Sequence, residues 1–356
     1  MNYIEESKKR LKERIVNSPN IFLDNDGFLF DNTEKMNDAA IFTLREIFHI
    51  DPLTFKRTVA LKNLEKFYSE NPSVYARVPW VASESLKLLR QEIENEGEDS
   101  YISEFDIFRM SSRAYGGAFL YDSDLSIENV NQHLQDFYTK NPEYYDYNTK
   151  YADEILGKIQ DEIKLFSSTK TSLFNETSVA NGITSRLVFE VYLGIFFGKF
   201  DMEILPIPGA VDLVNKLSEY ARKSHKRFGV ISNRSSDSLL ALLRRFDFIG
   251  EDKIPEEYIT GADPILGGKP KLHTFRKFIP EAEKVVYFGD LPTDVEVCEV
   301  LNTTDGDGTA FCVVIPSKYE FTLQNNDGSH NFTEYQNTFC VCLSYPDIIS
   351  VLHELM

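Results

Sequence analysis

The chain has 356 residues, of which 42% are hydrophobic and 26% are charged, and its formal net charge at pH 7 is −18. This length and composition predict a soluble globular protein with one large domain or two. So acidic a chain excludes broad affinity for nucleic acid or anionic membranes, because binding to either requires a basic surface. A small phosphorylated ligand in a local basic pocket is still compatible with this charge.

The N-terminal stretch MNYIEESKKRLKERIV is charged, has a helical pattern, and lacks the apolar core of a signal peptide. No apolar run reaches the roughly 18–20 residues that span a bilayer. We therefore expect a cytoplasmic protein. Four cysteines are present: Cys298, Cys312, Cys340 and Cys342. Their contexts are apolar and their spacing is not that of a zinc site, so we expect buried, reduced thiols.

The stretch IFLDNDGFLF at 21–30 places Asp24 and Asp26 between two apolar runs. An ordinary turn explains Asn, Asp and Gly at such a place, because each of them tolerates tight backbone geometry. A turn does not require both acids, however. The stretch by itself leaves two interpretations open, a turn or a site.

The pattern of apolar and polar residues changes twice along the rest of the chain. From Thr33 to about Leu205 it shows helical segments, with apolar residues spaced near 3.6, and polar loops. After LPIPGA, apolar strands alternate with helices, and the strands read RFGVISN, EKVVYFGD, AFCVVIP and TFCVCLS. Apolar strands that alternate with helices indicate a parallel α/β sheet.

The first 32 residues predict a helix followed by a further strand, which ends at Leu23. Polar residues follow this strand and two of the later ones. In open parallel sheets, ligands bind beyond the carboxyl ends of the strands, and Asp24, Ser232 and Asp290 each fall at such an end. This coincidence favours a site over a turn. A second acidic run, TTDGDGTAF at 303–311, follows a helix rather than a strand, so we expect an exposed turn there.

Four stretches in chain order resemble the motifs of the haloacid dehalogenase superfamily of phosphatases and phosphotransferases. They are LDNDG, VISN, GGKPKLHTF and YFGDLPTDVEV. The third has the Lys-Pro-x-x-x-x-Phe form of the phosphoglycolate phosphatase and β-phosphoglucomutase branch. The match covers residues 18–32 and 205–300. One departure is Phe28, which stands where the family has a small hydroxylated residue.

The resemblance implies a Rossmann-like parallel sheet flanked by helices, formed by residues 1–32 and 205–356. It also implies a large, mainly helical cap at 33–204, inserted after the first strand. Asp24 would be the nucleophile, and Asp26 the general acid and base. Lys269 would neutralise the developing charge, with Lys271 as the competing candidate.

The same resemblance implies a phosphate and metal site. Ser232 and the backbone N–H of Asn233 would hold phosphate oxygens. Mg²⁺ would be bound by the Asp24 side chain, the Asp26 carbonyl and Asp290. Asp294 would act as an additional ligand or orient this cluster.

The function implied is a Mg²⁺-dependent phosphatase that hydrolyses a small phosphate monoester through an aspartyl-phosphate. Asp26 favours this reaction, because the dehalogenase and phosphonate-cleaving branches lack an acid there. A phosphomutase or other phosphotransferase is the alternative, and a non-catalytic binding protein of the same fold is a third reading. We expect a small phosphorylated metabolite as ligand, with no nucleic acid or membrane partner; the oligomeric state stays open.

Overall fold

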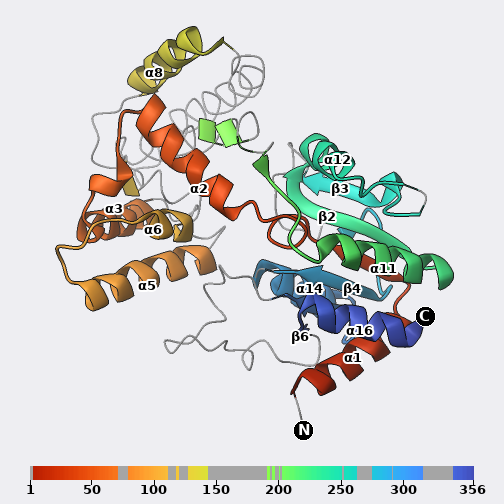
Figure 1. Cartoon of the computed structure of the whole chain (residues 1–356). Coiled ribbons are helices and arrows are strands. Elements are labelled where there is room, and N and C mark those ends of the chain that lie inside the picture. The colour runs from red at the N-terminus through yellow and green to blue at the C-terminus, as the bar shows by residue number, and fades with distance from the viewer. Residues whose placement is uncertain are drawn as a thin grey trace, which may run out of the picture. The chain divides into compact units, whose positions relative to one another are not determined.

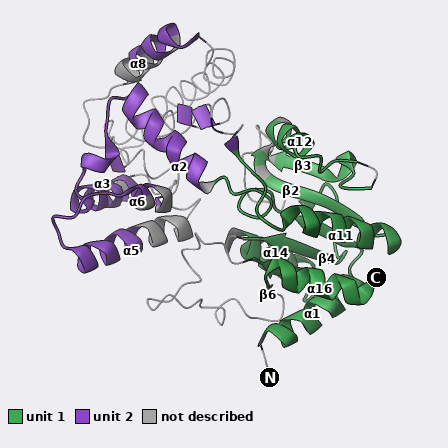
Figure 2. Cartoon of the chain, viewed as in Figure 1, with its two compact units in different colours: residues 1–32, 204–356 green, residues 33–203 purple. Residues whose placement is uncertain are grey.

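The protein is described from a computed structural model. The residues described are 3–70, 79–110, 118–119, 127–142, 191–192, 195–196, 200, 203–250, 252–262, 275–290, 292–315 and 340–356. The chain forms two compact units, shown in different colours in Figure 2. Unit 1 comprises residues 1–32 and 204–356, and unit 2 comprises residues 33–203.

Unit 1 is built on a six-stranded sheet in the order β3-β2-β1-β4-β5-β6, in which every neighbouring pair is parallel (Figure 1). The strands are β1 (Asn20–Leu23), β2 (Arg227–Ser235), β3 (Ile259–Ala262), β4 (Val285–Gly289), β5 (Ala310–Val314) and β6 (Cys340–Cys342). All four residues of the central strand β1 are fully buried, and three of them, Ile21, Phe22 and Leu23, are apolar. The predicted parallel α/β sheet is confirmed.

Helices flank this sheet. They are α1 (Tyr3–Asn17), α11 (Ala210–Lys223), α12 (Ser236–Arg245), α14 (Pro292–Asp305) and α16 (Tyr345–Leu355), with a short 3₁₀ turn at Glu256–Tyr258. Helices α1 and α11 both pack against α16 (Figure 1). Helix α16 begins with a capping box, in which Ser344 and Asp347 satisfy each other's backbone N–H groups.

The core on one face of the sheet joins β1, β4, β5 and β6 to α14. Phe22, Tyr287 and Cys312 contribute to it from the strands, and Cys298 and Leu301 contribute from the helix. All four cysteines are buried and free, which confirms the expectation of buried thiols.

Every regular element described in unit 2 is helical. They are α2 (Thr33–Phe42), a π-helical turn (Thr43–Ile47), a 3₁₀ turn (Pro52–Thr54), α3 (Arg57–Glu70), α5 (Pro79–Glu96), α6 (Glu104–Arg109) and α8 (Ile127–Lys140). Arg57 is buried and paired with Asp106, at 2.9 Å, and with Glu96. Across the residues described in both units, no helix is long and apolar enough to cross a membrane.

The two connections to unit 2 run side by side within unit 1. The carbonyl of Leu29 accepts a hydrogen bond from the N–H of Ile207 at 2.9 Å, and Phe30 forms an antiparallel bridge with Pro206. The chain therefore leaves unit 1 and returns to it at one place.

The second acidic run is exposed only in part. Gly306 and Asp307 are exposed as expected, but the Asp305 side chain is 2% exposed. Arg276 donates two hydrogen bonds to it, at 2.7 and 2.6 Å, and the backbone N–H of Ala282 donates a third at 3.1 Å. The expectation of a wholly exposed turn is wrong for Asp305, because an arginine far from it in sequence binds its carboxylate.

This ion pair predicts acid-sensitive stability. The Arg276 hydrogen bonds, opposed by burial, hold the pKa of Asp305 below its ordinary value. A carboxyl whose pKa is lower in the folded state than in the unfolded state stabilises the fold at pH values above its unfolded-state pKa. This stabilisation is lost as the pH falls through its folded-state pKa. We expect Asp305→Asn to lower the free energy of unfolding at pH 7 by about 1–3 kcal/mol. Urea unfolding should show this difference shrinking below about pH 4.

Asp307→Asn is the matched control, because it removes an exposed acid from the same turn. It should change the free energy of unfolding by no more than about 0.5 kcal/mol. A destabilisation by Asp305→Asn that stays constant between neutral and acid pH would contradict the assignment of the ion pair.

Candidate active site

Two neighbouring strands deliver carboxylates to the same edge of the sheet. Leu23, the last residue of β1, pairs with Phe288 of β4, and the N–H of Asp24 still donates to the Phe288 carbonyl at 2.7 Å. Asp290 directly follows the end of β4. Because parallel strands end at the same edge, Asp24 and Asp290 meet there.

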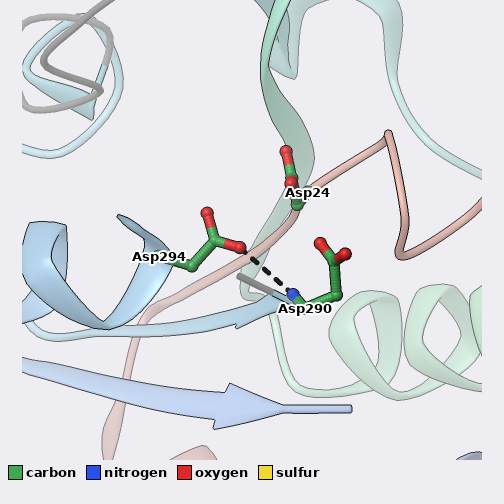
Figure 3. Close-up of side chains that lie close together, drawn as sticks. All are labelled: Asp24, Asp290 and Asp294. Carbon is green, nitrogen blue, oxygen red and sulfur yellow. Dashed lines mark hydrogen bonds between the residues drawn. The ribbon is translucent and has the colours of Figure 1, made fainter. Parts of the chain in front are cut away.

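The first turn of α14 contributes a third carboxylate. Asp294 accepts a hydrogen bond from the backbone N–H of Asp290 through its Oδ2 atom at 3.1 Å, as the dashed line in Figure 3 marks. One carboxylate oxygen from each of Asp24, Asp290 and Asp294 lies within 4.8 Å of the others. The exposed fractions of these residues are 4%, 4% and 0%, so this aspartate cluster is buried.

Three carboxylates this close repel one another, and burial strengthens the repulsion. Their negative charge also acts on the neighbouring Tyr287. The hydroxyl of Tyr287 donates a hydrogen bond to the Ile231 carbonyl at 3.0 Å. Burial first, and then the charges of Asp24 and Asp294, raise the pKa of Tyr287 well above its usual value. A set of hard oxygen donors with excess negative charge fits Mg²⁺ or a similar divalent cation.

Two glycines allow the aspartate cluster to form. A Cβ atom on Gly289 would lie 2.2 Å from Asp294 Oδ2, and one on Gly27 would lie 2.0 Å from Asp290 Oδ2. Gly27 also has a φ of +82°, which side chains rarely adopt. The glycines in the first and fourth motifs therefore make room for the carboxylates.

Asp26 lies outside the aspartate cluster. Its side chain is 29% exposed and bonds to Arg234 of β2, at 2.9 Å between Arg234 Nη2 and Asp26 Oδ1. The loop that carries it is compact, because the Asn25 carbonyl accepts hydrogen bonds from the N–H groups of Leu29 and Phe30. The two acids of one motif thus have different surroundings.

Phe28 and Tyr345 fasten this loop to the body of unit 1. Phe28 is fully buried, and its ring packs against those of Phe288 and Tyr345. The Tyr345 hydroxyl donates to the Phe28 carbonyl. An aromatic residue is therefore accommodated where the resembled family has a small hydroxylated one.

The sequence predicts that Ser232 ends its strand, and this prediction is wrong. Strand β2 continues to Ser235, but its register with β3 shifts between Ile231 and Ser235. Ser232 lies within this irregularity, is 2% exposed, and its hydroxyl is 3.4 Å from Asp26 Oδ2. Of Asn233 only the backbone is described, as part of β2.

Lys269 and Lys271 lie outside the described residues, so the choice between them stays open. Two residues not predicted for the site, Arg234 and Asn32, donate hydrogen bonds to Asp26. The sequence carries no signal for Arg234, because the predicted strand ends before it, and only the continuation of β2 to Ser235 places this arginine on a strand.

No protein-family model matches the chain, and no curated protein matches it. Two similar solved structures are a haloacid dehalogenase-like hydrolase from Streptococcus pneumoniae and a candidate phosphoglycolate phosphatase from Lactobacillus delbrueckii subsp. bulgaricus. Each is 12% identical, covers 94% of this chain and 98% of its own, and has a TM-score of 0.44. Likeness this distant carries no functional conclusion, whereas the arrangement of the chain's own residues does.

The aspartate cluster predicts stabilisation by divalent cations. Millimolar Mg²⁺ should raise the melting temperature in a thermal unfolding assay, because a cation at 100 times its dissociation constant stabilises the fold by about 2.7 kcal/mol. Asp290→Asn should remove this increment without lowering the stability of the cation-free protein, since it relieves repulsion. Asp307→Asn, which lies outside the cluster, should keep the full response. An unchanged response in Asp290→Asn would contradict the site.

Gly289→Ala should distort the aspartate cluster by a steric clash with Asp294. The added Cβ displaces the Asp294 carboxylate, so we expect a stability loss of about 1–3 kcal/mol and no cation response in the same assay. Gly250→Ala is the control, because nothing lies within 4 Å of a Cβ at that position. A folded Gly289→Ala variant with an undiminished cation response would show that Asp294 is not needed for binding.

Proposed function

We propose that the chain is a phosphatase of the haloacid dehalogenase superfamily that hydrolyses a small phosphate monoester. The observation that carries the proposal is the division between the two acids of one loop. Asp24 belongs to the aspartate cluster, whereas Asp26 lies apart from it and is paired with Arg234. One acid is suited to attack phosphorus beside a cation, and the other is suited to move a proton. The order of the four motifs supports the same assignment.

The reaction has two steps. Asp24 attacks phosphorus, forming an aspartyl-phosphate as the bond to the leaving oxygen breaks. Asp26 gives that oxygen a proton and then takes one from the water that hydrolyses the aspartyl-phosphate. Ser232 and the Asn233 N–H hold the phosphate oxygens, and a lysine, Lys269 or Lys271, neutralises the developing charge.

The aspartate cluster is the proposed Mg²⁺ site. The side chains of Asp24 and Asp290, with the Asp26 carbonyl, would hold the cation, and Asp294 would be a further ligand or orient Asp290 through its N–H. When bound, Mg²⁺ offsets the charge of the phosphate beside the carboxylates.

Unit 2 is the proposed cap, and it selects the substrate, a small phosphorylated metabolite. The net charge of −18 supports a small ligand over nucleic acid or an anionic membrane. A phosphomutase would use the same residues of unit 1. Product analysis separates the two, because only hydrolysis releases inorganic phosphate.

The test is phosphate release from p-nitrophenyl phosphate and a panel of sugar, nucleotide and glycolate phosphates, with Mg²⁺ or with EDTA. We expect turnover that requires Mg²⁺ and falls by at least about 10⁴-fold in Asp24→Asn, because removing a nucleophile removes the covalent route. A single turnover in ¹⁸O-labelled water should place the label in phosphate. None of the label should enter Asp24 in that turnover, because water attacks phosphorus rather than the acyl carbon.

Asp307→Asn is the control, because it removes a similar charge at an exposed position outside the site. Turnover by Asp24→Asn at the wild-type rate would refute the nucleophile. Conversion of a sugar phosphate into its isomer without phosphate release would establish the phosphomutase instead. Cation and phosphate binding by a folded wild type without any turnover would favour the binding protein.

A further inference from the structure

Arg234 is a buried cation held at two points. Its side chain is 1% exposed. Nε and Nη2 donate to Asp26 Oδ1 at 3.2 and 2.9 Å, and Nη1 donates to the Ser238 hydroxyl of α12 at 3.0 Å. A planar guanidinium held from both sides has little freedom to turn. It therefore supplies a rigid support for the Asp26 carboxylate.

The two oxygens of Asp26 differ in their surroundings. Besides the two bonds from Arg234, Oδ1 accepts hydrogen bonds from the side-chain amides of Asn25 and Asn32, both at 2.8 Å. The hydrogen bond described for Oδ2 is a single long one, from the Ser232 hydroxyl at 3.4 Å. Four donors crowd one oxygen, while the other faces the proposed phosphate ligand Ser232.

We propose that Arg234 is a positioning residue, which holds Asp26 through Oδ1 so that Oδ2 is the atom that transfers the proton. The inference rests on the proposed function and deepens it. In the first step a bond forms between Asp24 and phosphorus and the bond from phosphorus to the leaving oxygen breaks. That oxygen keeps the electron pair and receives the proton from Asp26 Oδ2.

Two alternatives make different predictions. If Arg234 only stabilised the fold, its loss would slow all substrates alike. If it bound phosphate directly, its loss would raise KM for all of them. If it positions the acid, its loss slows a substrate in proportion to how much the leaving group needs a proton. Phenolate needs protonation far more than p-nitrophenolate does.

The experiment compares kcat and KM of the full-length enzyme with Mg²⁺ for phenyl phosphate, p-chlorophenyl phosphate and p-nitrophenyl phosphate. We expect Arg234→Met to lose about 100-fold in kcat/KM on phenyl phosphate, the lower end of what a general acid contributes. On p-nitrophenyl phosphate the loss should be no more than about 10-fold. Arg234→Lys, which keeps the charge, should recover part of the difference and serves if the methionine variant does not fold.

Arg227→Met is the matched control on the same strand. Arg227 lies at the opposite end of β2, opposite Asn20, and bonds to Glu283 at 2.6 Å and to the Phe278 carbonyl at 3.1 Å. Its removal breaks an ion pair of unit 1 far from the edge where Asp24 and Asp290 meet. It should lower the melting temperature and leave the dependence on the leaving group unchanged.

The double variant Asp26→Asn/Arg234→Met should lose no more on phenyl phosphate than Asp26→Asn alone, because the two residues act as a unit. Equal losses by Arg234→Met on all three substrates, or a rise in KM alone, would overturn the inference. The failure of the proposed acid is distinguishable: Asp26→Asn itself would then show the wild-type dependence on the leaving group.

Discussion

Repulsion among three buried carboxylates is the constraint around which the carboxyl edge of the sheet is organised. Asp24, Asp290 and Asp294 share a space in which their oxygens lie within 4.8 Å of one another. Bringing like charges together away from water costs free energy, and a protein keeps such an arrangement where a cation or a reaction uses it. The neighbouring residues show its effects, from the glycines that make room for the carboxylates to the raised pKa of Tyr287.

Unit 1 balances its acids in two ways. Asp26 has a cation supplied by the chain, because Arg234 is built into β2 and cannot leave. For the aspartate cluster we propose instead a divalent cation from solution, which can bind and dissociate. The permanent cation holds a side chain in one orientation, whereas the exchangeable one can share its charge with a phosphate. In the proposed reaction, this difference suits one acid to proton transfer and the others to phosphate chemistry.

The parts of the site that follow from local pattern could be predicted from the sequence. Asp24 and Asp290 directly follow apolar strands, and parallel strands end at one edge, so their meeting was predictable. Asp294 follows Asp290 by four residues at the start of a helix. The separate surroundings of Asp26 were not predictable, because they depend on the backbone of Gly27 and on Arg234, which is 208 positions away.

The structure differs from the sequence-based predictions where distant residues decide the local conformation. The sequence predicts that the strand ends at Ser232, whereas β2 continues to Ser235 with a shift of register against β3. The sequence predicts an exposed turn at Asp305, whereas Arg276 covers its carboxylate. Residues close in sequence predict neither where a strand stops pairing with its neighbour nor which distant residue binds a given acid.

The pairing of the two connections has a consequence for chain entropy. Leu29 and Phe30, where the chain leaves unit 1, pair with Ile207 and Pro206, where it returns. Folding of unit 1 therefore closes the whole of segment 33–203 into a loop with fixed ends. The entropy of closing a loop grows only logarithmically, by about 0.6 kcal/mol for each doubling of its length. Unit 1 thus accommodates inserted segments of very different lengths with nearly the same stability.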